Sequence, residues 1–268
     1  MSGIPYALKT GAVIAGYDIV RVLGAGGFGI TYEAASAVTG KRVAIKEFFP
    51  RGIASRDSAT RIIFDEKENE VVAWVLKRFE SSTTDQCRLK HPNIVEVLHY
   101  VKDNGTGYMI MEYVEGQTLE HWLRDREKAP TSAELQAVTR PILDALHYLH
   151  GQSLIHRDIA PDNIMIRLDG KPMIIDFGAL KLIEQQTQVR SKTNRSFAVS
   201  KQFYSPSEQM DGDSDLDARA DIYSMGRRSI AHSQAARPRM PTTARRSSRA
   251  RKTIRTFRCA RLRHSPTP

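Results

Sequence analysis

The stretch "LIHRDIAPDNIMI", Leu154 to Ile166, sets charged residues between two apolar runs. It holds the triplet HRD at residues 156–158, and an asparagine follows five residues after the aspartate. A further apolar run, "PMII", then leads into the triplet DFG at residues 176–178. Each triplet is unremarkable alone, so their meaning depends on what precedes them in the chain.

A glycine-rich turn precedes them, in "YDIVRVLGAGGFGITYEA" at residues 17–34. Apolar residues alternate on both sides of the turn, which predicts two strands joined by a flexible loop. Glycines allow backbone N–H groups to approach phosphate oxygens closely. By itself the GxGxxG pattern also fits an ordinary hairpin turn, or a dinucleotide-binding turn if a helix followed it.

The segment after the turn, "TGKRVAIKEF" at residues 39–48, reads as another strand. A strand in this place disfavours a dinucleotide-binding turn and favours a glycine loop that covers nucleotide phosphates. Lys46 on this strand would then reach the α and β phosphates. The alternative for Lys46 is a solvated lysine at the edge of a strand.

In this order and at these separations, the motifs resemble those of eukaryotic-like protein kinases, and most closely the bacterial serine/threonine kinases. The resemblance covers about residues 15–226. It implies an α+β, bilobal protein-kinase fold with a small antiparallel-sheet N-lobe and a mostly helical, incomplete C-lobe. We divide the chain into an N-terminal extension (1–14), the N-lobe with its hinge (15–114), a partial C-lobe (115–226) and a basic tail (227–268).

The resemblance implies ATP and Mg²⁺ as cofactors. Met111 would guard the back of the adenine pocket, while Ala44 and Met165 would sandwich the base. Glu112 and Val114 would offer it backbone groups. The complete set expected to contact the nucleotide is Leu23, Gly24, Gly26, Gly27, Gly29, Thr31, Ala44, Lys46, Met111, Glu112, Val114 and Met165.

The resemblance also implies roles in phosphoryl transfer to a protein substrate with a serine or threonine hydroxyl. Asp158 would accept the proton of that hydroxyl, and Asn163 and Asp176 would hold Mg²⁺, a hard ion that prefers oxygen ligands. Asp221 would brace the backbone of the catalytic loop.

An activation loop would span residues 179–202. Its candidate hydroxyls are Thr187, Ser191, Thr193, Ser196 and Ser200, and a solvated polar loop is the alternative. Arg157 could pair with a phosphate on this loop, and Glu208 would lie at its end.

Two residues depart from the family pattern. Ala160 stands where serine/threonine kinases have a lysine that neutralises the γ-phosphate. Ser82 stands where a helix should supply the glutamate partner of Lys46, and the nearby carboxylates that could compensate are Glu68, Glu70 and Glu80. The segment "ESSTTDQCR", residues 80–88, has no apolar stripe at helical spacing, so we do not expect it to form a packed helix.

The net charge of +10 is confined to the end of the chain. Residues 227–268 contain 13 Lys and Arg and no Asp or Glu, whereas residues 1–226 hold 27 basic against 30 acidic residues. When suitable codons are chosen for residues 230–240 and read in a shifted frame, they encode a peptide that contains "YRALTGRPP". This peptide is close to the apolar helix that the resemblance leads us to expect at this point of the chain. We therefore interpret the tail as the product of a frameshift after Gly226, disordered and without a specific nucleic-acid partner.

Three hypotheses follow: an active serine/threonine kinase, an ATP-binding pseudokinase, or a nonfunctional frameshifted fragment.

No apolar run of 18 residues and no secretory signal occurs, which predicts a cytoplasmic protein without a membrane segment. Two cysteines, Cys87 and Cys259, do not suggest a disulfide framework. The sequence predicts no oligomeric state.

Overall fold

A computed structural model describes residues 4, 6–57, 60–156, 158–176, 219, 221–223 and 225. All of them belong to the first of two compact units, residues 1–236 and 237–268. The expectations for Arg157, for the activation loop at residues 179–202, for Glu208 and for the basic tail lie outside the described residues.

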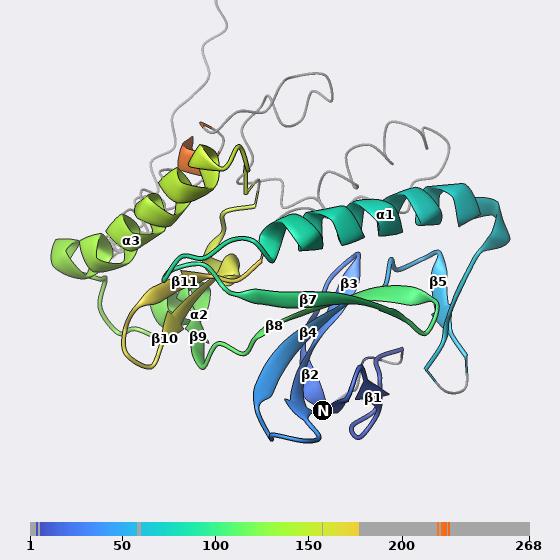
Figure 1. Cartoon of the computed structure of the whole chain (residues 1–268). Helices are drawn as coiled ribbons and strands as arrows, with labels where there is room; N and C mark the ends of the chain where they lie inside the picture. Colours follow the sequence, from blue (N-terminus) through green and yellow to red (C-terminus); the bar gives the residue numbers. More distant parts are fainter. Residues whose placement is uncertain are drawn as a thin grey trace, which may run out of the picture. The chain divides into compact units, whose positions relative to one another are not determined.

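A six-stranded antiparallel sheet in the order β1-β2-β3-β4-β8-β7 forms the N-lobe (Figure 1). Its strands are β1 (Val13–Ile14), β2 (Tyr17–Ala25), β3 (Gly29–Ser36), β4 (Arg42–Phe48), β7 (Val97–Asp103) and β8 (Thr106–Glu112). The alternation that predicted the first strands matches the observed hairpin of β2 and β3. The register also pairs Thr31 with Lys46, so both side chains lie on the same face.

The two faces of this sheet are covered differently. One face carries Tyr32, Val43 and Ile45, and packs against the segment that starts at Tyr6 and against a hairpin of β5 (Ala54–Arg56) and β6 (Ile62–Phe64). On the other face, Ala44, Phe48, Met109 and Met111 pack against α1 (Asn69–Gln86), which follows the 3-10 turn η1 (Glu66–Glu68). The N-terminal segment is therefore part of the lobe's core.

Our expectation that residues 80–88 form no packed helix is wrong, because α1 continues to Gln86. The buried stripe of this helix includes Phe79, Thr83 and Gln86. The Thr83 hydroxyl donates to the Phe79 carbonyl at 2.7 Å, and the Gln86 amide donates to the Ser82 hydroxyl at 3.0 Å. Because hydrogen bonds within the helix satisfy these buried polar groups, they can occupy positions at which the pattern demanded apolar residues.

The described C-lobe combines two helices with a small antiparallel sheet in the order β11-β10-β9. Its elements are β9 (Gly116–Thr118), α2 (Leu119–Arg124), α3 (Ser132–Gly151), η2 (Pro161–Asn163), β10 (Ile164–Arg167) and β11 (Pro172–Ile174). Thr131 and Glu134 form a capping box that fixes the start of α3. The core of this lobe contains Ile142, Leu146, Ile159 and Ile174.

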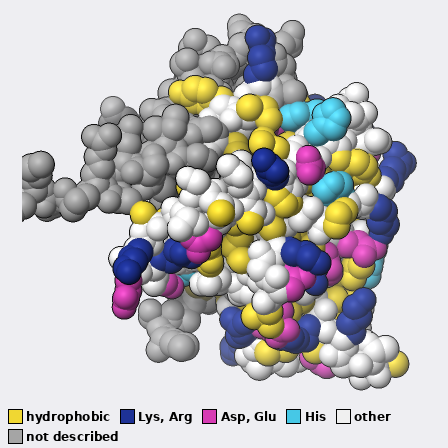
Figure 2. Space-filling model, turned by 90° about the vertical axis from the view of Figure 1, so that its left-hand side faces the viewer, with side chains coloured by type: hydrophobic (Ala, Val, Ile, Leu, Met, Phe, Trp, Pro, Cys, Tyr) yellow, Lys and Arg dark blue, Asp and Glu magenta, His cyan; other side chains and the backbone are white. Residues whose placement is uncertain are grey.

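The surface of the described part mixes charges of both signs. On the face in Figure 2, Lys and Arg side chains lie next to Asp and Glu side chains. Among the described residues, no helix has the length and apolar composition that crossing a membrane requires.

Candidate active site

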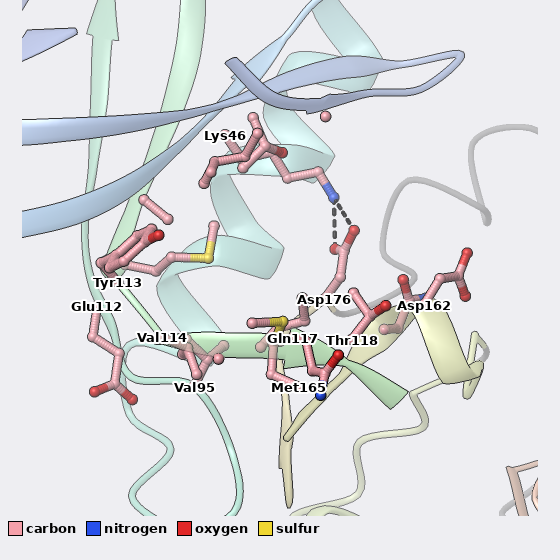
Figure 3. A pocket seen from close by; sticks show the side chains of 18 of the residues that line it. Lys46, Val95, Glu112, Tyr113, Val114, Gln117, Thr118, Asp162, Met165 and Asp176 are labelled. Atoms are coloured by element: carbon pink, nitrogen blue, oxygen red, sulfur yellow. Dashed lines mark hydrogen bonds and ion pairs between the residues drawn. The ribbon is translucent and has the colours of Figure 1, made fainter. Parts of the chain in front are cut away.

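A cavity of about 520 Å³ lies between the sheet of the N-lobe and the small sheet of the C-lobe. Its walls come from β2, β3, β4, β8 and the connection after it, β9, α2, η2, β10 and the residues after β11 (Figure 3). Of the expected residues, it is lined by Leu23, Gly24, Thr31, Ala44, Lys46, Met111, Glu112, Val114, Asn163, Met165 and Asp176. Segments from both halves of the described chain thus meet at one concave site.

Lys46 and Asp176 form the central polar contact of this cavity. The Lys46 ammonium donates to the two carboxylate oxygens of Asp176 at 2.6 and 2.7 Å, across 130 residues of sequence. The Lys46 side chain is 13% exposed and that of Asp176 is 38% exposed. Figure 3 shows the lysine reaching down from β4 to the aspartate.

The carboxylate expected on α1 is absent at Ser82, and Glu80 does not replace it. Glu80 forms an ion pair with Lys102 on β7, with an N–O distance of 2.6 Å. The proposed compensation by Glu80 is therefore wrong for this structure. In the described part of the chain, the charge partner of Lys46 comes from the DFG segment rather than from α1.

The glycine loop borders the cavity only in part, because Gly26, Gly27 and Gly29 are outside the cavity lining. The carbonyl of Gly27 accepts a hydrogen bond from the Arg51 amide at 2.8 Å, and that of Phe28 accepts one from the Phe49 amide at 2.9 Å. These bonds tie the loop to the chain that follows β4. At Gly29, a Cβ atom would lie 2.6 Å from the Glu47 carbonyl oxygen, so this close approach requires glycine.

Ala44 and Met165 line the same cavity from different lobes, and their role in sandwiching a flat base stays a prediction. The Glu112 amide donates to the Glu96 carbonyl at 2.9 Å, and the Glu96 amide donates to the Glu112 carboxylate at 3.0 Å. The N–H of Glu112 is thus already engaged, and other backbone groups of residues 112–114 would have to serve the base.

The expected catalytic loop, around His156 and Asp158, is held by buried and partly buried polar contacts. The backbone amide of His156 donates to the Asp221 carboxylate at 2.9 Å. The backbone amide of Asp158 donates to His156 Nδ1 at 3.3 Å. The expected bracing role of Asp221 is thereby confirmed. His150 also contacts this carboxylate at 2.9 Å, a partner that the sequence analysis did not identify.

Burial dominates the electrostatics of His156. It lowers the pKa of the imidazole, and the carboxylates of Asp221, Asp158 and Asp176 oppose this effect in part.

Asp158, the expected proton acceptor, is outside the cavity lining, whereas Asn163 faces the cavity. The Asn163 amide nitrogen donates to the Asp158 carbonyl at 2.8 Å, which fixes the asparagine side chain relative to the loop.

Several lining residues were missed by the sequence analysis: Arg21, Val95, Tyr113, Gly116, Gln117, Thr118, His121, Asp162 and Ile175. Three of them could have been suspected because they adjoin expected residues, namely Tyr113 between Glu112 and Val114, and Asp162 and Ile175 beside Asn163 and Asp176. Arg21 and His121 carried no comparable signal, because their place at the cavity depends on how β2 and α2 approach it.

Sequence comparisons relate the chain to known proteins. Residues 17–262 match the family model described as "Protein kinase domain". A probable serine/threonine-protein kinase of Streptomyces coelicolor, SCO3848, is 31% identical over 78% of this chain and 29% of its own length. Serine/threonine-protein kinase PknA of Nostoc is 31% identical over 78% of this chain and 35% of its own length. The chain thus spans about a third of the length of these relatives.

Solved structures show the same fold. The apo form of PpkA-294 superposes with a TM-score of 0.72 at 27% identity, covering 82% of this chain and 76% of that one. A single-site mutant of the PknI kinase domain of Mycobacterium tuberculosis superposes with a TM-score of 0.62 at 24% identity, covering 89% of this chain and 81% of that one.

Proposed function

Because the chain belongs to the protein kinase family, we propose that it transfers the γ-phosphoryl group of ATP to serine or threonine hydroxyls of a protein substrate. The observation that carries this proposal is the meeting of Lys46 and Asp176 at the cavity that Asn163 also lines. One cation and two oxygen-bearing side chains then face the place where the phosphates of a nucleotide would lie.

The residues present suit a magnesium ion. The carboxylate of Asp176 and the side-chain carbonyl of Asn163 are hard oxygen donors, and the hydrogen bond to the Asp158 carbonyl uses only the NH₂ group of Asn163. When bound, Mg²⁺ would neutralise charge on the phosphates. Lys46 would have to share Asp176 with the ion or turn toward the phosphates.

Asp158 is proposed to orient the hydroxyl of the substrate and to accept its proton. The hydroxyl oxygen forms a bond to the γ-phosphorus, while the bond between that phosphorus and the bridging oxygen of ADP breaks and its electron pair leaves with ADP. Asp221 supports this step indirectly, because it holds the loop through the His156 amide.

The test incubates the full chain with Mg²⁺, radiolabelled ATP and casein as a generic substrate. We expect labelled phosphoserine or phosphothreonine, and a loss of about 10²–10⁴-fold in rate for Asp158→Ala. ATP binding by this variant should stay within about twofold of the unmodified chain. Transfer that persists in Asp158→Ala would contradict the assignment of the proton acceptor.

A second candidate function is nucleotide binding without transfer, as in a pseudokinase. Two observations favour it: Ser82 offers no carboxylate to Lys46, and Ala160 replaces the lysine expected near the γ-phosphate. The same assay separates the two functions, because a pseudokinase would bind ATP and leave casein unlabelled. A chain that neither binds ATP nor labels casein would favour the nonfunctional fragment.

A further inference from the structure

A cluster of charged and aromatic side chains lies at one end of the cavity, outside the phosphate region, next to residues 113–115, which connect β8 to β9 and which we call the hinge. It consists of Arg21, Glu33, Arg42, Tyr113 and Glu115, and we call it the hinge clamp. Arg21 is opposite Glu33, and Glu33 is opposite Ala44, in the register of neighbouring strands. Their side chains therefore share the face of the sheet that carries Ala44 and Lys46.

Glu33 is the buried member of the hinge clamp, with a side chain only 8% exposed. One carboxylate oxygen lies 2.7 Å from Arg21 Nη2, and the other lies 3.6 Å from Arg42 Nη1. A buried carboxylate is costly without partners, so Glu33 holds both arginines at fixed places on the sheet.

The two arginines in turn hold the hinge. The Arg42 guanidinium lies 4.6 Å from the centroid of the Tyr113 ring, and its Nη2 lies 2.7 Å from Glu115. Arg21 donates to the Tyr113 hydroxyl at 3.3 Å. The ring and the hydroxyl of Tyr113 and the carboxylate of Glu115 are thus all held by arginines of the N-lobe sheet. Tyr113 and Glu115 flank Val114 in the sequence.

We propose that Glu33 and Arg42 are positioning residues for base recognition: through Tyr113 and Glu115 they hold the backbone at Val114 in place for the adenine. This inference rests on the proposed nucleotide-binding function. It separates the site into a base end that the hinge clamp fixes and a phosphate end that Lys46 and Asp176 form. Removing the hinge clamp should therefore weaken binding of the base and spare binding of the phosphates.

The test measures binding of adenosine and of magnesium tripolyphosphate to the full chain by calorimetry. We expect Arg42→Ala to weaken adenosine binding about fivefold, the size that loss of a cation–π contact and a surface ion pair allows. Tripolyphosphate binding should change by less than about twofold. Arg42→Lys keeps the charge but loses the planar stacking surface, so it should show an intermediate loss and also covers a failure of Arg42→Ala to fold.

The matched control is Arg88→Ala, which removes an exposed arginine from an ion pair with Asp85 at the end of α1. It should change the binding of neither ligand. If the unmodified chain and both Arg42 variants bind adenosine with equal affinity, the positioning role is overturned but the proposed function is not. The same holds if the variants lose equal affinity for adenosine and for tripolyphosphate. If the unmodified chain binds neither adenosine nor ATP, the proposed function fails as well.

Discussion

Lys46 Nζ lies 2.6 and 2.7 Å from the two carboxylate oxygens of Asp176, and this pair joins the N-lobe sheet to the segment after β11. In the resembling family the lysine also has a glutamate on the helix that corresponds to α1. The family pattern assigns that position to Ser82, and Asp176 is both the partner of the lysine and the proposed ligand of Mg²⁺. Lys46 and a bound Mg²⁺ would therefore compete for the carboxylate of Asp176.

Introducing the absent carboxylate should relieve this competition. We expect Ser82→Glu to increase the rate of phosphoryl transfer about fivefold, because a partly buried ion pair with Lys46 adds roughly 1 kcal/mol and frees Asp176 for the metal ion. Initial rates at saturating ATP would show the change. Ser81→Glu adds the same charge at an exposed neighbouring position and should leave the rate unaltered. Equal effects of the two variants would argue against the ion pair.

The glycine loop provides a test of close packing. Gly29→Ala should destabilise the fold by about 1–3 kcal/mol, because its Cβ would meet the Glu47 carbonyl oxygen at 2.6 Å. Gly24→Ala has open space around the added methyl group and should leave the stability within about 0.5 kcal/mol. Urea unfolding followed by circular dichroism measures both. A destabilisation by Gly24→Ala as large as that by Gly29→Ala would refute the steric explanation.

The buried ion pair between Glu47 and Arg56 should contribute strongly to the free energy of unfolding of the N-lobe. Glu47 is fully buried, lies 2.6 Å from Arg56, and accepts hydrogen bonds from the hydroxyls of Tyr32 and Tyr108 at 2.7 and 2.9 Å. Glu47→Ala leaves Arg56 with a buried, unpaired charge, so we expect a loss of about 3–5 kcal/mol in the free energy of unfolding.

The controls for this pair are an exposed pair and a double variant. Glu80→Ala breaks the ion pair with the exposed Lys102 and should cost at most about 1 kcal/mol. Replacing both buried charges, as in Glu47→Met with Arg56→Met, should recover part of the loss because no unpaired charge remains. A double variant less stable than Glu47→Ala would contradict this account.

His156 predicts a pH dependence of stability. Burial lowers its pKa in the folded chain, so below about pH 6.5 the unfolded chain binds a proton that the folded chain does not. The free energy of unfolding should therefore fall as the pH decreases from about 7 to about 5, by up to about 1.4 kcal/mol per pH unit. His156→Asn should flatten this decline, and urea titrations at several pH values measure it.

The exposed His147 on α3 provides the comparison for His156. His147→Asn tests whether removal of any histidine changes the decline. An identical decline in the unmodified chain and in His156→Asn would show that other groups govern the acid sensitivity.

Much of the fold and of the site followed from local patterns. The alternation around the glycine loop predicted β2 and β3, and the resemblance to protein kinases predicted eleven of the residues that line the cavity, including Leu23 and Asp176. The continuation of α1 through Thr83 and Gln86 was not predicted, because hydrophobic periodicity does not register buried polar groups that bond within their own helix.

The sequence by itself determined the family, the order of the motifs and the residue types that each motif offers, since each motif is a short run of residues and the order of the runs is a property of the chain alone. Only the tertiary structure decided which charges pair: Lys46 with Asp176, Glu80 with Lys102, Glu47 with Arg56, and Glu33 with Arg21 and Arg42. Ion pairing depends on distance in space and on desolvation, and strand register and helix packing set both. A chain with 40 basic and 30 acidic residues offers many pairings, and folding selects among them by bringing particular side chains within a few ångströms.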